Sequence, residues 1–425
     1  MTSKWKIYTL HELYTISSGL SKKREEFGFG YPFLTFKEVF HNPIVPNELP
    51  ELANTTDKER ERCSIKRGDV FLTRTSEKLD ELGLSSVALK DYPNATFNGF
   101  TKRLRPNGKC VELLIPEYVA FYLRSAEFRN QVTSFASMTT RASLNNEMIS
   151  KLTIKVPPLT IQKQIADTMI NLLLKEETNK NAVHLLEQIA QTLFKYWFID
   201  FEFPNEDGLP YKSNGGKMVE SELGEIPERW KVGELQELAN KLYAGGTPSR
   251  KKEEYWLNGN IPWLKTKEIK NKYIINAEES ITKQGLEGSS AKWIPPHSVV
   301  VAMYGATAGQ LGYLAKEMTS NQACCAIVSD IPNFIYSYLR LNQERLRDLA
   351  TGSAQQNLSK DVISKFKIIC PLKDILITYE TIVTELSEQI IELTNENNSL
   401  EQLRDTLLPE LLSGEIEIPE ESVVG

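Results

Sequence analysis

The feature that most constrains this chain is an internal repeat at an interval of 214 residues. ISKLTIKVP (149–157) aligns with ISKFKIICP (363–371), and LEQIAQTL (186–193) with LEQLRDTL (400–407), in both cases without a gap. Further upstream the offset changes, as expected where loops differ in length: YPFLTFKEV (31–39) aligns with IPWLKTKEI (261–269), and Trp5-Lys6-Ile7 with Trp230-Lys231-Val232. Chance similarity between short apolar segments does not explain two ungapped matches at one offset. The chain is therefore predicted to be a duplication.

Each half shows the same order of elements, a globular segment and then a long heptad segment. β-branched runs bounded by turn formers, such as DVFLT (69–73) and SVVVAM (298–303), predict strands. Asn145 and Ser359, which lie 214 residues apart, are predicted N-caps of short helices. The fold class expected for each half is α/β, with a long helix following the globular unit.

A length of 425 residues favours more than one domain. The predicted boundaries are a first globular unit at 1–157, a first long helix at 158–203, a linker with a second globular unit at 204–372, a second long helix at 373–416 and an acidic tail at 417–425. Proline, Asn-Gly-Gly and Asp-Gly between Phe201 and Pro227 indicate the linker.

Both long segments carry a heptad seam, with spacings that alternate between four and three residues. In the first half the seam is Ile165, Met169, Leu172, Glu176, Asn179, Val183, Leu186, Ala190, Leu193 and Trp197. In the second half it is Tyr379, Val383, Leu386, Ile390, Leu393, Asn397, Leu400, Arg404, Leu407 and Leu411. The seams are predicted to pack together as a coiled coil. The alternative is that each helix packs on its own domain core.

Two seam asparagines favour an antiparallel coiled coil. An antiparallel register sets Asn179 opposite Asn397, whereas a parallel one sets each asparagine against Leu393 or Val183. A buried asparagine is costly without a polar partner and tends to fix the register. From Ile165 to Trp197 such a helix would be about 50 Å long, at about 1.5 Å per residue. If both globular units bind DNA, such a spacing would place their half-sites about one to one and a half DNA turns apart, with an unread gap between them.

The net charge of −6 argues at first sight against a nucleic-acid partner. The acidity is concentrated in residues 372–425, with 2 basic against 13 acidic residues, whereas residues 1–157 hold 23 basic against 18 acidic. Both globular units are mildly basic, so DNA remains a possible partner.

The motif search favours a non-catalytic protein. No P-loop, HExxH or clustered His/Cys pattern occurs, and the Pro-Pro pairs in VPPL and IPPH do not fit an amino-methyltransferase motif. The five cysteines lack zinc spacing and are expected to be reduced structural thiols. No signal peptide or run of about 20 apolar residues is present, which predicts a cytoplasmic protein without a membrane partner.

Several longer segments resemble one known family, the specificity subunits of type I restriction-modification enzymes. They are LGEIPERWKVGELQEL (223–238), GGTPSRKKEEYWLNGNIPWLKTKEI (245–269), TGSAQQNLSKDVISKFKIICP (351–371) and LLEQIAQTLFKYWFIDFE (185–202). The resemblance implies two target-recognition domains that read a bipartite, asymmetric site in double-stranded DNA. It also implies two modification (methyltransferase) and two restriction (motor and nuclease) subunits as partners. S-adenosylmethionine, ATP and Mg would be cofactors of those partners, with none in this subunit.

Candidate DNA contacts in the second half cluster around GGTPSRKK. Thr247 and Pro248 predict a helix start, so that Ser249 to Trp256 would begin a helix whose free amides face a phosphate. Nearby basic residues extend this candidate set: Arg250, Lys251, Lys252, Lys265 and Lys267. Lys22, Lys23 and Arg24 hold the corresponding place in the first half, whose segment 17–34 lacks the Gly-Gly-Thr-Pro-Ser loop. The alternative for each residue is a solvated basic loop.

Base reading requires side chains with paired donors or acceptors. The candidates are Arg74 after the DVFLT run, Arg141, Gln355 and Gln356, and Tyr304 is a candidate for stacking or phosphate binding. These residues can equally serve only to cap turns. Two other functions remain open, a coiled-coil scaffold or adaptor without sequence-specific DNA binding, and a cryptic enzyme.

Overall fold

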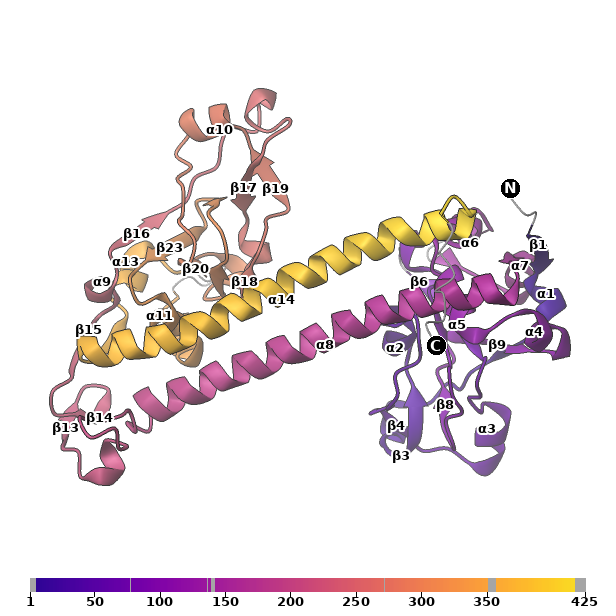
Figure 1. Ribbon diagram of the computed structural model, residues 1–425, viewed down its shortest axis with the longest axis horizontal. Coiled ribbons are helices and arrows are strands. Elements are labelled where there is room, and N and C mark those ends of the chain that lie inside the picture. Colours follow the sequence, from indigo (N-terminus) through magenta and orange to yellow (C-terminus); the bar gives the residue numbers. More distant parts are fainter. Residues whose placement is uncertain are drawn as a thin grey trace, which may run out of the picture. The chain divides into compact units, whose positions relative to one another are not determined.

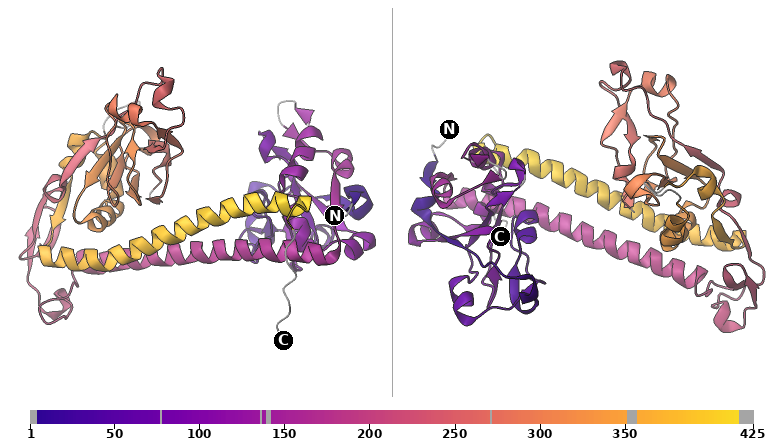
Figure 2. Two further views of the ribbon diagram at one scale, coloured as in Figure 1. Left: turned by 45° about the horizontal axis from the view of Figure 1, so that its top comes forward. Right: turned by 180° about the vertical axis from the view of Figure 1, so that it is seen from behind.

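A computed structural model describes residues 5–76, 78–135, 137–138, 142–270, 272–350 and 357–416. The chain divides into two compact units, Met1–Glu176 with Ser399–Gly425, and Glu177–Asn398. Two uninterrupted helices, α8 (Leu159–Phe198) and α14 (Lys373–Ser413), each contribute one segment to either unit (Figures 1 and 2). Strands and helices are mixed in both units, which confirms the predicted α/β fold class.

The first unit is built on a four-stranded antiparallel sheet. Its order is β2 (Tyr14–Ser18), β9 (Thr101–Pro106), β5 (Val70–Thr73) and β7 (Ser85–Val87). Alternate side chains of β5 face different cores, Val70 and Leu72 one and Phe71 the other. The helices that contribute to the core of Val70 include α5 (Pro116–Tyr122), α6 (Ala126–Phe135) and α7 (Asn146–Lys151).

The second unit repeats this plan with one more strand. Its sheet has the order β16 (Lys241–Ala244), β23 (Cys324–Val328), β20 (Val299–Ala302), β21 (Leu311–Leu314) and β18 (Lys272–Ile274). Val299 and Val301 face the core that includes residues of the long helices, and Val300 faces a second core. The shorter helices that contribute to the first of these cores include α11 (Pro332–Leu341), α12 (Gln343–Asp348) and α13 (Lys360–Ser364).

Strand registers confirm the duplication residue by residue. β1 (Lys6–Thr9) pairs antiparallel with β12 (Thr153–Val156), and β15 (Lys231–Glu234) pairs antiparallel with β24 (Lys367–Cys370). Lys6 lies opposite Val156, and Lys231 lies opposite Cys370. The predicted N-caps are also confirmed, because the Asn145 side chain accepts from Met148 N at 2.8 Å and that of Ser359 from Val362 N at 3.1 Å.

A small side sheet repeats in the same way. The first unit has the order β4 (Leu52–Ala53), β3 (Phe27–Leu34), β8 (Thr96–Phe97), and the second β19 (Glu279–Ile281), β17 (Ile261–Leu264), β22 (Thr319–Ser320). β3 pairs parallel with β8 from Phe33 to Leu34, and β17 pairs parallel with β22 from Trp263 to Leu264. The predicted alignment of 31–39 with 261–269 is therefore confirmed.

Within each unit the segments of α8 and α14 pack side by side and antiparallel. In the first unit Ile165 and Met169 share a core with Leu411. In the second, the ring centroids of Trp197 and Tyr379 lie 6.0 Å apart. The remaining apolar seam residues are buried or half-buried: Leu172, Val183, Leu186, Ala190, Leu193, Val383, Leu386, Ile390, Leu393, Leu400 and Leu407. The predicted antiparallel coiled coil is confirmed. Residues of both helices also belong to the cores of the two units. The alternative, that each helix packs on a domain core, therefore holds in addition to the coiled coil.

The polar seam positions correct one detail. Asn179 and Asn397 are both buried, as predicted, but Asn179 Nδ2 donates to Glu396 Oε2 at 2.7 Å rather than to Asn397. The carboxylate is the stronger acceptor, because a charge-assisted hydrogen bond outweighs an amide–amide one. In the first unit the seam residues Glu176 and Arg404 form an ion pair at 3.1 Å.

The segment predicted to be the linker, between Phe201 and Pro227, contains ordered structure. It contains the hairpin of β13 (Met218–Ser221) and β14 (Gly224–Pro227), and Phe203 stacks between Tyr211 and Trp230 at centroid distances of 4.6 and 4.9 Å. Stacking of three aromatic rings, of which Phe203 and Trp230 are buried, offsets the conformational entropy lost when this glycine- and proline-containing segment is ordered. A reading based on turn formers missed the aromatic residues between them.

Candidate nucleic-acid interface

The loop that follows β16 begins with a close backbone contact. A Cβ on Gly245 would lie 2.3 Å from Ser320 O, and Gly246 N donates to that same oxygen at 2.8 Å. At the equivalent place in the first unit, a Cβ on Gly19 would lie 2.4 Å from Asn98 O. Both glycines are needed because two backbone segments meet there without room for a side chain.

The helix predicted from Ser249 to Trp256 does not form. Turns occupy this segment up to a short 3₁₀ turn, η4 (Glu253–Tyr255), and the cap position is Lys252 instead of Thr247. Trp256 Nε1 donates to Ser249 O at 3.1 Å, and the Thr247 hydroxyl contacts Gln322, so side chains tie down the loop that the sequence assigned to a helix. A helix N-terminus therefore offers no phosphate site here.

Arg250 is exposed but firmly oriented. Its guanidinium carbon lies 3.5 Å from the Trp256 ring centroid, and Nη2 lies 2.6 Å from Glu279 Oε2. The side chain is 53% exposed, so part of it remains accessible to a ligand. An aromatic stack and a carboxylate hold an arginine in one direction without consuming all five of its donors.

The remaining basic residues of this cluster differ in how far carboxylates neutralise them. Lys265 Nζ lies 2.6 Å from Glu279 and 3.2 Å from Glu278, and Lys267 Nζ lies 2.5 Å from Glu278. The hydrogen bond from Lys265 is the main cause of the lowered pKa of Glu279. Lys251 and Lys252 are exposed, and Lys252 Nζ donates to the Tyr255 hydroxyl at 2.8 Å. Ser249 is exposed beside Arg250.

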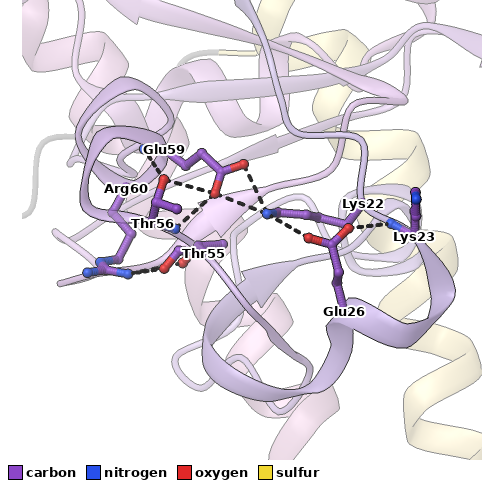
Figure 3. Close-up of polar contacts among 7 residues, drawn as sticks. All are labelled: Lys22, Lys23, Glu26, Thr55, Thr56, Glu59 and Arg60. Atoms are coloured by element: carbon purple, nitrogen blue, oxygen red, sulfur yellow. Dashed lines mark hydrogen bonds and ion pairs between the residues drawn. The ribbon is translucent and has the colours of Figure 1, made fainter.

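The corresponding basic residues of the first unit divide similarly (Figure 3). Lys22 Nζ lies 3.1 Å from Glu26 and 3.0 Å from Glu59, with its side chain only 8% exposed. Burial disfavours the charged form of Lys22 and so acts to lower its pKa. The hydrogen bonds to Glu59 and Glu26 outweigh this effect, and the pKa of Lys22 is raised. Lys23 and Arg24 are exposed, so they are better placed than Lys22 to meet a ligand.

A second group of cations lies where β2 and β5 end and β9 begins. Lys102 Nζ donates to Ser18 Oγ at 2.8 Å, and Arg74 follows directly after β5. Lys102 is 7% exposed, and its pKa is lowered by burial and by the charge of Arg74. Sequence reasoning selected Arg74 but missed Lys102. The available signal was TKRLR (101–105), three cations inside a β-like run.

Other candidates are only partly described. Tyr304 is 42% exposed and forms a backbone bridge with Asn357. Arg141, Gln355 and Gln356 lie outside the described residues.

Features of other protein classes are not found in the described part of the chain. None of its helices combines the length and apolar character needed to cross a bilayer. No three His, Cys, Asp or Glu side chains of the described residues are grouped so that they could hold a metal ion. All five cysteines are buried free thiols, as predicted.

The chain is built from a duplicated α/β unit and two antiparallel helices. Comparison with known protein families identifies the class of protein that has this architecture. Residues 2–188 and 227–403 match the family described as "Type I restriction modification DNA specificity domain". The chain belongs to this family.

Curated relatives agree with this assignment, and a solved structure shows the same fold. The type I restriction enzyme HindI specificity subunit of Haemophilus influenzae is 26% identical, with 97% of this chain and 100% of the relative covered. The type I restriction enzyme MjaIX specificity subunit of Methanocaldococcus jannaschii is 24% identical, with 98% and 94% covered. The crystal structure of the S subunit of a type I restriction-modification system from M. genitalium superimposes with a TM-score of 0.61 at 14% identity, covering 96% of each chain.

Proposed function

We propose that this chain is the DNA-specificity subunit of a type I restriction-modification complex. The observation that carries the proposal is the duplicated α/β unit within a family match that spans both halves. A duplicated reader on one chain suits a bipartite site, and two units with different loops suit an asymmetric one. The readers would occupy residues 1–157 and 204–372.

The partners follow from this role. The chain acts with DNA and with other subunits, and the catalytic activities of the system lie in those subunits. The complete assembly would hold two modification and two restriction subunits, which bring S-adenosylmethionine, ATP and Mg. The chain itself needs no cofactor for this role. It would act in the cytoplasm, where host DNA is found.

The candidate contacts form two tiers. Exposed basic or polar residues that lack full carboxylate pairing form the first: Lys23, Arg24, Ser249, Arg250, Lys251 and Lys252. In the second tier Lys22, Lys265 and Lys267 would have to exchange a carboxylate for a phosphate. Thr247, Tyr304, Arg74, Arg141, Gln355 and Gln356 complete the proposal.

Methylome sequencing tests the function directly. The chain is co-expressed with its modification subunits in a host without DNA methylation, and we expect methylation at one split motif with a constant gap. A complex that methylates nothing in the presence of this chain, or methylates without sequence preference, would indicate an adaptor. Methylation by the isolated chain would indicate an enzyme.

A binding assay then tests the contacts. In the purified complex, Arg250→Ala is expected to weaken binding to the motif about tenfold, because a charge-assisted hydrogen bond is lost. Lys217→Ala is the matched control, because Lys217 is an exposed cation of the β13–β14 segment, 3.9 Å from Glu228. Equal affinities of the two variants would remove Arg250 from the interface.

A further inference from the structure

The ionic environment of Lys102 differs from that of every neighbouring cation on β9. Arg105 pairs with Asp69 at 2.6 Å, and the charge of Asp69 also acts on Arg103. For Lys102, the charge that acts on it is that of Arg74, which has the same sign. Its hydrogen-bond acceptor is a neutral hydroxyl, that of Ser18.

Arg74 adds to this unbalanced charge. Its Nε is buried and has no hydrogen-bond partner among the residues that the structure describes. Placing a half-buried guanidinium beside a buried ammonium is unfavourable unless an anion joins them. Each cation loses hydration, and no carboxylate within the described part of the chain pairs with either of them. Ser18, which accepts from the Lys102 ammonium, is exposed, so the buried lysine lies next to the solvent-facing rim of the sheet.

The second unit shows that the fold does not require this charge. The strand registers make Ser18, Arg74 and Lys102 equivalent to Ala244, Met303 and Cys325. Arg74 N donates to Phe100 O and Met303 N to Ala323 O, which fixes the same equivalence through the loops. The three second-unit residues belong to or pack against one apolar core. Core packing therefore explains why the second unit has apolar residues at these three positions. It does not explain the two cations at the equivalent positions of the first unit.

We infer that Ser18, Arg74 and Lys102 form a binding site for a DNA backbone phosphate that is present in the first unit and absent from the second. The inference rests on the proposed DNA-reading function and deepens it. It assigns Arg74 to the sugar–phosphate backbone rather than to a base edge. A guanine edge offers two acceptors but no negative charge, whereas a phosphodiester supplies the missing counter-charge.

The test uses the full complex with its modification subunits and two duplexes, one with the motif from methylome sequencing and one with that motif scrambled. Lys102→Met and Arg74→Met are each expected to weaken binding to both duplexes about tenfold. The slope of log Kd against log salt should fall by about 0.9 for the loss of one phosphate contact. Lys151→Met is the control, because Lys151 is an exposed cation of the same unit, already paired with Glu147 at 2.7 Å.

A second measurement separates binding from folding. The melting temperature of Lys102→Met should equal or exceed that of the wild type, because an unbalanced buried charge has been removed. Inorganic phosphate, compared with chloride at equal ionic strength, should raise the melting temperature of the wild type more than that of the variant.

The contrary outcomes are distinct. Unchanged affinity and salt slope in both variants, or a loss of binding that accompanies a lower melting temperature, would overturn the phosphate site. A loss confined to the motif duplex with an unchanged slope would instead indicate a base contact. A wild-type complex that binds both duplexes equally contradicts the proposed function itself, whatever the variants do.

Discussion

The two units share a backbone plan but differ in charge at equivalent places. The trio Ser18, Arg74 and Lys102 stands where the second unit has Ala244, Met303 and Cys325. Along the long helices, the ion pair of Glu176 with Arg404 stands, at the repeat offset, where the second unit has Ile390 and Ala190. The two units retain the same pattern of hydrogen-bonded strands. The side chains at the strand ends and in the helix seam differ between them. The same backbone arrangement therefore accommodates either apolar or charged side chains at these positions.

The largest effect is expected from placing the first unit's charge in the second. Cys325→Lys would bury an ammonium in an apolar core and lower the unfolding free energy of the second unit by about 3–5 kcal/mol. Denaturant titration followed by tryptophan fluorescence measures this, because Trp197, Trp230, Trp256, Trp263 and Trp293 lie in that unit. The reverse change, Lys102→Cys, should not destabilise the first unit. A loss below about 1 kcal/mol in Cys325→Lys would contradict the apolar assignment.

The seam ion pair should come next. Arg404→Met removes one cationic partner of Glu176, whose side chain is buried, and we expect a loss of about 2–3 kcal/mol in the first unit because a charge-assisted hydrogen bond is lost. The double variant Glu176→Leu, Arg404→Met should recover most of it, since it copies the apolar character of the second unit. Calorimetric melting of the three proteins tests this. If the double variant melts no higher than the single one, apolar residues cannot replace the ion pair. The statement that the two units are interchangeable at this position would then be wrong.

A pH difference between the units is the third prediction. Main-chain amides near the start of α11 donate to Glu380, whereas at α5 the neutral Gln162 accepts from Ile115 N. Burial raises the pKa of Glu380 to about 7, against the hydrogen bonds that lower it. Because the folded pKa lies above the usual value of 4.5, the native state binds the proton more tightly. The stabilisation is therefore complete below about pH 4.5 and is lost as the pH rises through about 7.

The variant Glu380→Gln should remove this dependence. We expect the unfolding free energy of the wild-type second unit to fall by roughly 2–3 kcal/mol between those pH values, and that of the variant to stay flatter. Urea titrations across the pH series give both curves, and parallel curves would exclude Glu380 as the source. The first unit, with Gln162 at this contact, is the internal control.

The smallest effect is expected where the units agree. Asn145→Ala and Ser359→Ala each remove the N-cap of an equivalent short helix, so each should cost its own unit about 1 kcal/mol. Thermal melting of both variants measures the two losses of stability. A cost that differs by more than about twofold between the units would show that the two helices do not contribute equally.

Sequence reasoning succeeded where a pattern has one physical solution. The repeat located the equivalent strands, the N-caps and the antiparallel seam, because apolar spacing and capping chemistry act over a few residues. It failed in segments shaped by distant side chains. The Gly-Gly-Thr-Pro-Ser loop, predicted to start a helix, is held instead by the contacts of Trp256 and Gln322. The order within the linker, which the sequence did not indicate, comes from Phe203 packing on Trp230.

The candidate site shows the same limit. Residue type selected Lys22 and Lys265 as readily as Lys23 and Lys251, although carboxylates from other strands and loops neutralise only the first two. Lys102 was overlooked because a lysine within a β-like run resembles an exposed edge residue.

By itself the sequence determined the duplication, the α/β class, the paired heptad helices and the family, since these depend on periodicity and on long motifs. Only the tertiary structure decided which cations have counter-charges, which partner Asn179 takes and where the two units differ. The reason is physical, because electrostatic balance depends on distances between residues far apart in the chain. Lys22 meets Glu59 and Lys102 meets Arg74 only after folding.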